Sequence, residues 1–244
     1  MNNNTPSLEV SRTEQLGLLG DHLDEMRQTL LATLITIGCG MVAAFVFHRE
    51  IFALLTTPLD GVRLVLLSPL EGLITTFKMC FWVGTAGTFF IWIQFILKFL
   101  TPALHERERK VAFPLFLMSC LFGAIGIVFS YFVTIPLANS YLKAFNTGLG
   151  ENFWSLSSYM DYTLGLMLAN LLAFEFGALF LVLIHYEIIS EELLRSYRRV
   201  SYLVIFIASA ILTPPDVITQ LMMALPLLLM YEAGLFWAAK TKTL

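Results

Sequence analysis

Residues 162 to 186 read YTLGLMLANLLAFEFGALFLVLIHY, and this stretch decides the fold class. A membrane-spanning α-helix needs about 20 mostly apolar residues, and the run is long enough to meet that need. Among Asp, Glu, Lys and Arg, only Glu175 occurs in it. A carboxylate inside a bilayer is costly and usually faces a bundle interior or a wet cavity. The stretch therefore predicts a spanning helix and makes Glu175 a candidate functional residue.

The composition of the whole chain agrees with a membrane protein. Its 244 residues are 57% hydrophobic and only 14% charged, whereas soluble domains carry about 25% charged residues. The net charge of −3 is too small to suggest a nucleic-acid partner. The three cysteines lie in apolar runs without metal-ligand spacing, and no nucleotide-binding or hydrolase motif occurs. We expect no metal or cofactor, and an enzyme is the least supported class.

Six apolar runs predict an all-α polytopic protein. The runs cover residues 30–47, 72–97, 111–137, 162–186, 200–212 and 217–231. The last two are short, because 13 to 15 helical residues span only about 20 to 23 Å of a hydrocarbon core of about 30 Å. They are separated by TPPD, so a single re-entrant hairpin is the alternative to two short spans. We favour two spans.

Six spans place both termini on one side of the membrane, and the basic residues indicate which side. Eleven Lys and Arg residues fall in one set of connecting segments and three in the other. The excess of Lys and Arg marks the cytoplasmic side. We therefore predict a cytoplasmic N-terminal segment with an amphipathic helix (1–28), a membrane domain (29–238) and a cytoplasmic tail (239–244).

Two predicted cytoplasmic segments carry acidic residues among basic ones. They are DHLDEMRQTL at 21–30 and FLTPALHERERK at 99–110. These charges are either ordinary solvated loop charges or an acidic patch for a cationic ligand. Arginine is the natural guest of such a patch, because its planar guanidinium can bind a carboxylate through two hydrogen bonds.

Five motifs in order resemble the TatC family, which supplies the core subunit of the twin-arginine protein translocase. They are HLDEMR at 22–27, SPLEGL at 68–73, FLTPALHERER at 99–109, FEF at 174–176 and LTPPDVITQ at 212–220. The resemblance runs over about residues 20 to 237. It implies a concave, glove-like bundle in the bacterial cytoplasmic (inner) membrane, with short fifth and sixth helices.

The resemblance also implies a binding site for signal peptides that carry two consecutive arginines. Glu25 and Glu108 match the two glutamates of that site, and Arg27 and Arg109 match neighbouring family positions that support its surface. The apolar part of the same loop is matched by Phe99, Pro102 and Leu104. TatC-like proteins bind TatA- and TatB-type single-span subunits and other TatC copies, and the proton-motive force drives export. The lipid bilayer is the remaining expected partner.

Other matched positions lie within or between the spans. Glu175 matches the family's intramembrane glutamate, and Gln94 and Gln220 are candidate polar contacts. The matched structural positions are Pro58, Pro69, Pro214, Pro215 and Asp216. Gly177 departs from the family, which commonly has a proline there, and Gln94 is displaced by one position.

The role of Glu175 has two interpretations. A proton-coupled small-solute carrier is the alternative function, with Glu175 as its proton site, although few polar residues occur in the other spans. We favour a polar contact that a neighbouring helix, water, a lipid headgroup or a partner helix satisfies. On the outer side, Glu71 and Lys78 share a helix face. They are either interface-level charges or contacts for the signal peptide or a partner.

Overall fold

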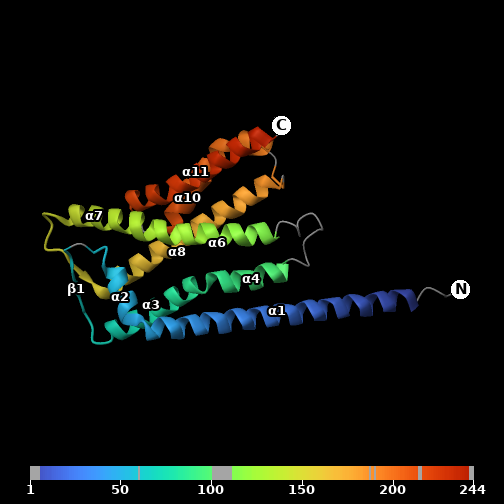
Figure 1. Cartoon of the computed structure of the whole chain (residues 1–244), viewed down its shortest axis with the longest axis horizontal. Coiled ribbons are helices and arrows are strands. Elements are labelled where there is room, and N and C mark those ends of the chain that lie inside the picture. The colour runs from blue at the N-terminus through green and yellow to red at the C-terminus, as the bar shows by residue number, and fades with distance from the viewer. Residues whose placement is uncertain are drawn as a thin grey trace.

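Among the residues that the structure describes, the fold is helical apart from two three-residue strands (Figure 1). The structure is a computed structural model, and it describes residues 6–59, 61–100, 112–186, 188–189, 191–213 and 216–241. In chain order the elements are α1 (Pro6–Val46), α2 (His48–Thr56), β1 (Arg63–Val65), α3 (Glu71–Gly87), α4 (Phe89–Leu100), α6 (Ala112–Phe129), the π-helix η2 (Ser130–Thr134), α7 (Ile135–Asn146), β2 (Phe153–Ser155), α8 (Leu156–His185), α9 (Glu191–Ser196), α10 (Arg198–Leu212) and α11 (Val217–Thr241). The predicted all-α class is confirmed.

Four helical segments of the described chain are long and apolar enough to cross a membrane. They are Leu23–Val46, Ala112–Asn146, Leu156–His185 and Val217–Ala239. A fifth span results if the bent pair α3 and α4 counts as one. Helix α10 has 15 residues and covers about 22 Å, which is short of a hydrocarbon core of about 30 Å. The count of six spans stays a prediction.

The second predicted span is broken rather than continuous. Helices α3 and α4 meet at Thr88 with a bend of 57°. No proline causes the break, and side chains donate to backbone carbonyl groups beside it. The Thr88 hydroxyl donates to the carbonyl oxygen of Gly84 at 2.8 Å, and the Trp92 indole Nε1 donates to that of Thr85 at 3.1 Å. The apolar pattern alone does not reveal such a bend.

The last helix is longer than its uninterrupted apolar run. That run ends at residue 231, before Glu232, whereas α11 continues to Thr241. The Glu232 carboxylate lies 2.6 Å from the Arg198 guanidinium of α10. Glutamate is a good helix former, so the end of the apolar run before Glu232 is not the end of the helix. The sixth helix is therefore not short in the structure.

Helix α8 is the central element of the bundle. It packs against α6, α3 and α11 (Figure 1). In the most apolar segment of α8, 50% of the residues are buried within the protein. In the most apolar segment of α1, only 6% of the residues are buried. Helix α1 contacts α3 and α4 and leaves most of its apolar surface exposed. The stretch that decides the fold class thus also forms much of the core.

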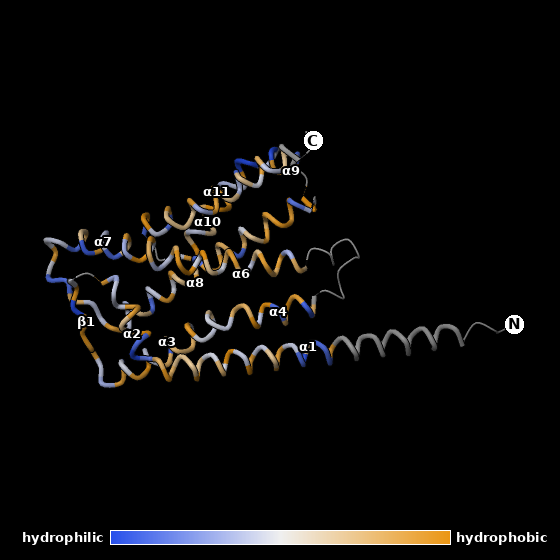
Figure 2. The backbone as a smooth tube through the Cα atoms, in the orientation of Figure 1, coloured by the Kyte–Doolittle hydropathy of each residue, from blue (hydrophilic) through white to orange (hydrophobic). Residues whose placement is uncertain are grey.

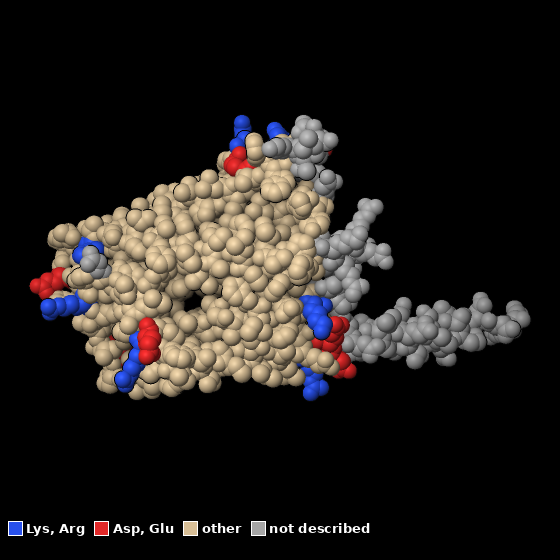
Figure 3. Space-filling model, in the orientation of Figure 1, with Lys and Arg blue, Asp and Glu red and all other residues tan. Residues whose placement is uncertain are grey.

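The surface is apolar in the middle and charged at its ends. Figure 2 shows hydrophobic residues along the central parts of the helices, and Figure 3 shows Lys, Arg, Asp and Glu mainly at the two ends of the visible face. The N-terminal part of α1 and the C-terminal part of α11 point toward the same end, where α4 ends and α6 begins (Figure 1). This distribution of apolar and charged surface suits a bilayer.

Candidate functional site

The first candidate site lies at the end of the bundle where α4 ends. Glu25 is half-buried and Arg27 is exposed on α1, and Phe99 is half-buried near the end of α4. Because α1 and α4 are in contact, the helices that carry Glu25 and Phe99 lie side by side. The predicted partners Pro102, Leu104, Glu108 and Arg109 lie outside the described residues.

The second candidate site is Glu175, in the middle of α8. The side chain is half-buried, and its Oε1 atom is buried without a hydrogen-bond partner among the described residues. It faces α6, where the Ser119 hydroxyl and Cys120 lie beside the carboxylate. Burying a polar atom without a hydrogen bond costs about 1 to 3 kcal/mol. The carboxylate is therefore poised to accept a hydrogen bond from an additional donor.

The two glutamines predicted as polar contacts do not supply that donor. The Gln220 amide of α11 donates to the carbonyl oxygen of Phe206 at 3.2 Å and so links α11 to α10. Gln94 is exposed on α4. Since Glu175 Oε1 is unpartnered in the described part of the chain, neither amide bonds to it there. A role of Gln94 or Gln220 toward a partner stays a prediction.

Several predicted structural residues have identifiable contacts. Asp216 caps α11, because its Oδ1 accepts the Thr219 backbone N–H at 2.8 Å. The carbonyl oxygen of Pro58 accepts from the Asn139 amide at 3.1 Å and so joins the end of α2 to α7. Pro69 is exposed two residues before α3. Pro214 and Pro215 lie outside the described residues.

Glu71 has a role that the sequence did not indicate. Its side chain is buried at the start of α3 and accepts four hydrogen bonds. Oε2 accepts the backbone N–H groups of Leu67 and Ser68, whereas Oε1 accepts the Ser155 hydroxyl at 2.7 Å and the Ser157 N–H at 2.9 Å. The carboxylate thus joins the loop before α3 to the start of α8. The strands β1 and β2 pair in the same region.

Lys78 also has a specific partner. Its Nζ lies 2.8 Å from the Asp161 carboxylate of α8, and both side chains are partly exposed. Asp161 directly precedes the apolar run of the fourth span. Because Lys78 and Asp161 are 83 residues apart, their pairing could not be predicted from the sequence. The prediction that Glu71 and Lys78 share a face therefore missed that each binds the beginning of α8.

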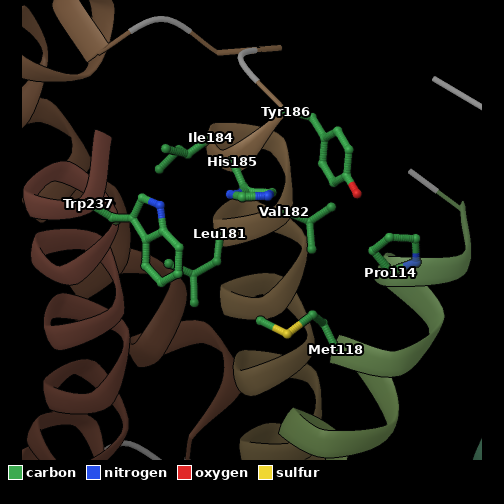
Figure 4. Close-up of a pocket in the computed structure, with 9 residues that line it drawn as sticks. Pro114, Met118, Leu181, Val182, Ile184, His185, Tyr186 and Trp237 are labelled. Carbon is green, nitrogen blue, oxygen red and sulfur yellow. The ribbon is translucent and has the colours of Figure 1, made fainter. Parts of the chain in front are cut away.

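A cavity of about 290 Å³ lies between α6, α8 and α11 (Figure 4). It is lined by Pro114, Met118, Leu181, Val182, Ile184, His185, Tyr186, Gly234 and Trp237. The His185 ring makes edge contacts with the rings of Tyr186 and Trp237. The described residues that line the cavity include no carboxylate beside His185. Among the described residues, no group of three or more His, Cys, Asp or Glu residues could hold a metal ion.

An apolar helical bundle with charged ends and several helices long enough to cross a membrane defines a polytopic α-helical membrane protein. The sequence model of the family described as Sec-independent protein translocase protein (TatC) matches residues 21–226. The chain therefore belongs to the TatC family.

Named relatives cover nearly the whole chain. The Sec-independent protein translocase protein TatC of Aquifex aeolicus is 34% identical over 89% of this chain and 93% of its own length. The protein of the same name from Desulforapulum autotrophicum is 28% identical over 94% of this chain and 87% of its own length. The chloroplastic TATC protein of Pisum sativum is 30% identical over 96% of this chain and 67% of its own length.

Two solved structures share the fold. A crystal structure of the twin-arginine translocase receptor TatC superposes with a TM-score of 0.75 at 33% identity, covering 91% of this chain and 99% of that one. A second, of the receptor in DDM, superposes with a TM-score of 0.77 at 34% identity, covering 89% and 99%. The relatives are translocase components, so the chain is assigned to protein transport.

Proposed function

We propose that this protein is the membrane receptor and core scaffold of a twin-arginine translocase. Family membership over most of the chain carries the proposal, and the two solved structures that share the fold are described as structures of a twin-arginine translocase receptor. In this role it binds the signal peptides of folded proteins and recruits TatA- and TatB-type single-span subunits. The proton-motive force drives export across the bacterial inner membrane, and both termini are cytoplasmic.

The proposed signal-peptide site combines charge with apolar contact. Glu25 on α1 and Glu108 each receive one of the two guanidinium groups, because a carboxylate and a guanidinium form paired, charge-assisted hydrogen bonds. Phe99, near the end of α4, offers apolar contact to the peptide's hydrophobic stretch. The contact between α1 and α4 supports this arrangement, since it places the helices of Glu25 and Phe99 together.

The proposed role of Glu175 is to bind a recruited partner. Its Oε1 is buried and unpartnered within the described chain, so a donor from a single-span subunit would complete its hydrogen bonding. The apolar surroundings strengthen such a bond, because a low dielectric weakens electrostatic attraction less than water does. Other copies of the protein and the bilayer complete the assembly.

The proposal is tested by capture of a twin-arginine signal peptide in membranes that contain the full-length protein. A peptide with two lysines is the ligand control. Glu25→Ala should reduce crosslinking about tenfold or more, since hydrogen bonds to charged groups contribute about 1.5 to 3 kcal/mol. Asp24→Ala is the matched control, because Asp24 is the exposed acidic neighbour of Glu25 on α1. Equal capture by the two variants and the wild type would remove Glu25 from the site.

A further inference from the structure

Glu175 rests against a glycine of the neighbouring helix. Ser119, Gly123 and Gly126 are the buried residues of α6. A Cβ atom added to Gly123 would lie 2.7 Å from the Glu175 Oε1 atom, 3.3 Å from a methyl carbon of Leu171 and 3.4 Å from the Phe89 ring. Real Cβ atoms essentially never approach another heavy atom closer than 3.0 Å. The place of the missing side chain at Gly123 is therefore occupied by the carboxylate.

Helix α8 is closely packed on two sides near Glu175. A Cβ atom on Gly126 would lie 3.0 Å from the carbonyl oxygen of Asn170, so the two backbones are close there as well. On the other side, a Cβ atom on Gly177 would lie 2.1 Å from the Met230 sulfur of α11. Glu175 is thus held in a segment that contacts α6 on one side and α11 on the other. Packed interiors transmit such displacements because they have few voids.

We propose that Gly123 is a positioning residue for Glu175. Because Gly123 has no side chain, the Glu175 carboxylate can lie against α6, where its Oε1 atom is buried, instead of pointing away from α6. A methyl group at this position turns the carboxylate outward. The functional consequence rests on the proposed role of Glu175 in partner binding, but the geometry can be tested without that role.

The first test measures how accessible the Glu175 carboxyl group is. A hydrophobic carbodiimide modifies carboxyl groups within membranes, and the modified residue is identified by mass spectrometry of the full-length protein. Gly123→Ala should raise the rate of Glu175 modification about twofold or more, the smallest change expected of directly coupled residues. Gly38→Ala is the matched control, because a Cβ atom on Gly38 meets nothing within 4 Å. An unchanged rate in Gly123→Ala would overturn the proposal.

The second test separates positioning from general packing. Glu175→Asp shortens the acid by one methylene and should restore most of the low modification rate in the Gly123→Ala background. Crosslinking to a single-span partner is then compared in all four combinations of Gly123→Ala with Glu175→Gln. If Gly123→Ala lowers crosslinking equally with Glu or Gln at 175, Gly123 acts through packing alone and the proposal fails. If modification responds as expected while no variant alters crosslinking, the partner role of Glu175 fails instead.

Discussion

Replacing Glu71 by glutamine tests whether one carboxylate holds together the end of the bundle where β1 and β2 pair. Its two oxygens accept four hydrogen bonds, two from the loop before α3 and two from the start of α8. Glutamine has one carbonyl oxygen, so its NH₂ group must face two of the four donors. Losing two hydrogen bonds to a charged group costs about 3 to 6 kcal/mol, taking about 1.5 to 3 kcal/mol for each.

The assay is reversible unfolding of the purified protein in detergent, followed by tryptophan fluorescence. Trp154 is a local reporter, because it lies in β2 next to Ser155, which donates to Glu71. Limited proteolysis of the segment between α7 and β2 gives a second readout, and we expect faster cleavage in Glu71→Gln. Glu151→Gln is the matched control, since Glu151 is an exposed acid in that segment.

The reasoning fails if the unfolding free energy of Glu71→Gln lies within about 0.5 kcal/mol of that of Glu151→Gln, the range of ordinary surface substitutions. Equal proteolysis rates would lead to the same conclusion. The four donors would then find water or other acceptors at little cost, and the carboxylate would not connect the two segments.

Two further substitutions probe other contacts of α8. Gly177→Ala should destabilise the protein by about 1 kcal/mol, the low end of the cost of overpacking, because its Cβ would lie 2.1 Å from the sulfur of the flexible Met230 side chain. Combining it with Met230→Ala should recover part of the loss in a denaturant titration. Lys78→Met should lower stability by no more than about 1 kcal/mol, as measured by thermal unfolding, because the pair with Asp161 is partly exposed. A loss of several kcal/mol would show that the pair is shielded from solvent.

Much of the architecture could be predicted because membrane insertion depends on the length and hydropathy of local segments of the sequence. An apolar run of sufficient length spans the bilayer whatever its neighbours are, and the basic residues that flank it bias its orientation. Five ordered motifs were enough to indicate the family that the comparison then established. Glu175 was recognisable for the same reason, since a charge within an apolar run is visible in the sequence.

The contacts of that residue were not predictable, because they join helices that are distant in the chain. Which donors meet Glu71, which acid meets Lys78 and which glycine receives Glu175 depend on how α8 packs against α3 and α6. The bend at Thr88 likewise rests on side-chain bonds that periodicity does not encode.

The sequence by itself thus determined the class of the protein, its apolar helices and its candidate acidic residues, because these follow from length, hydropathy and local motifs. Only the tertiary structure decided that the Glu175 carboxylate lies in the space left by Gly123 and that Glu71 joins two distant segments. The physical reason is that close packing and hydrogen bonding depend on three-dimensional approach, which one-dimensional spacing does not specify.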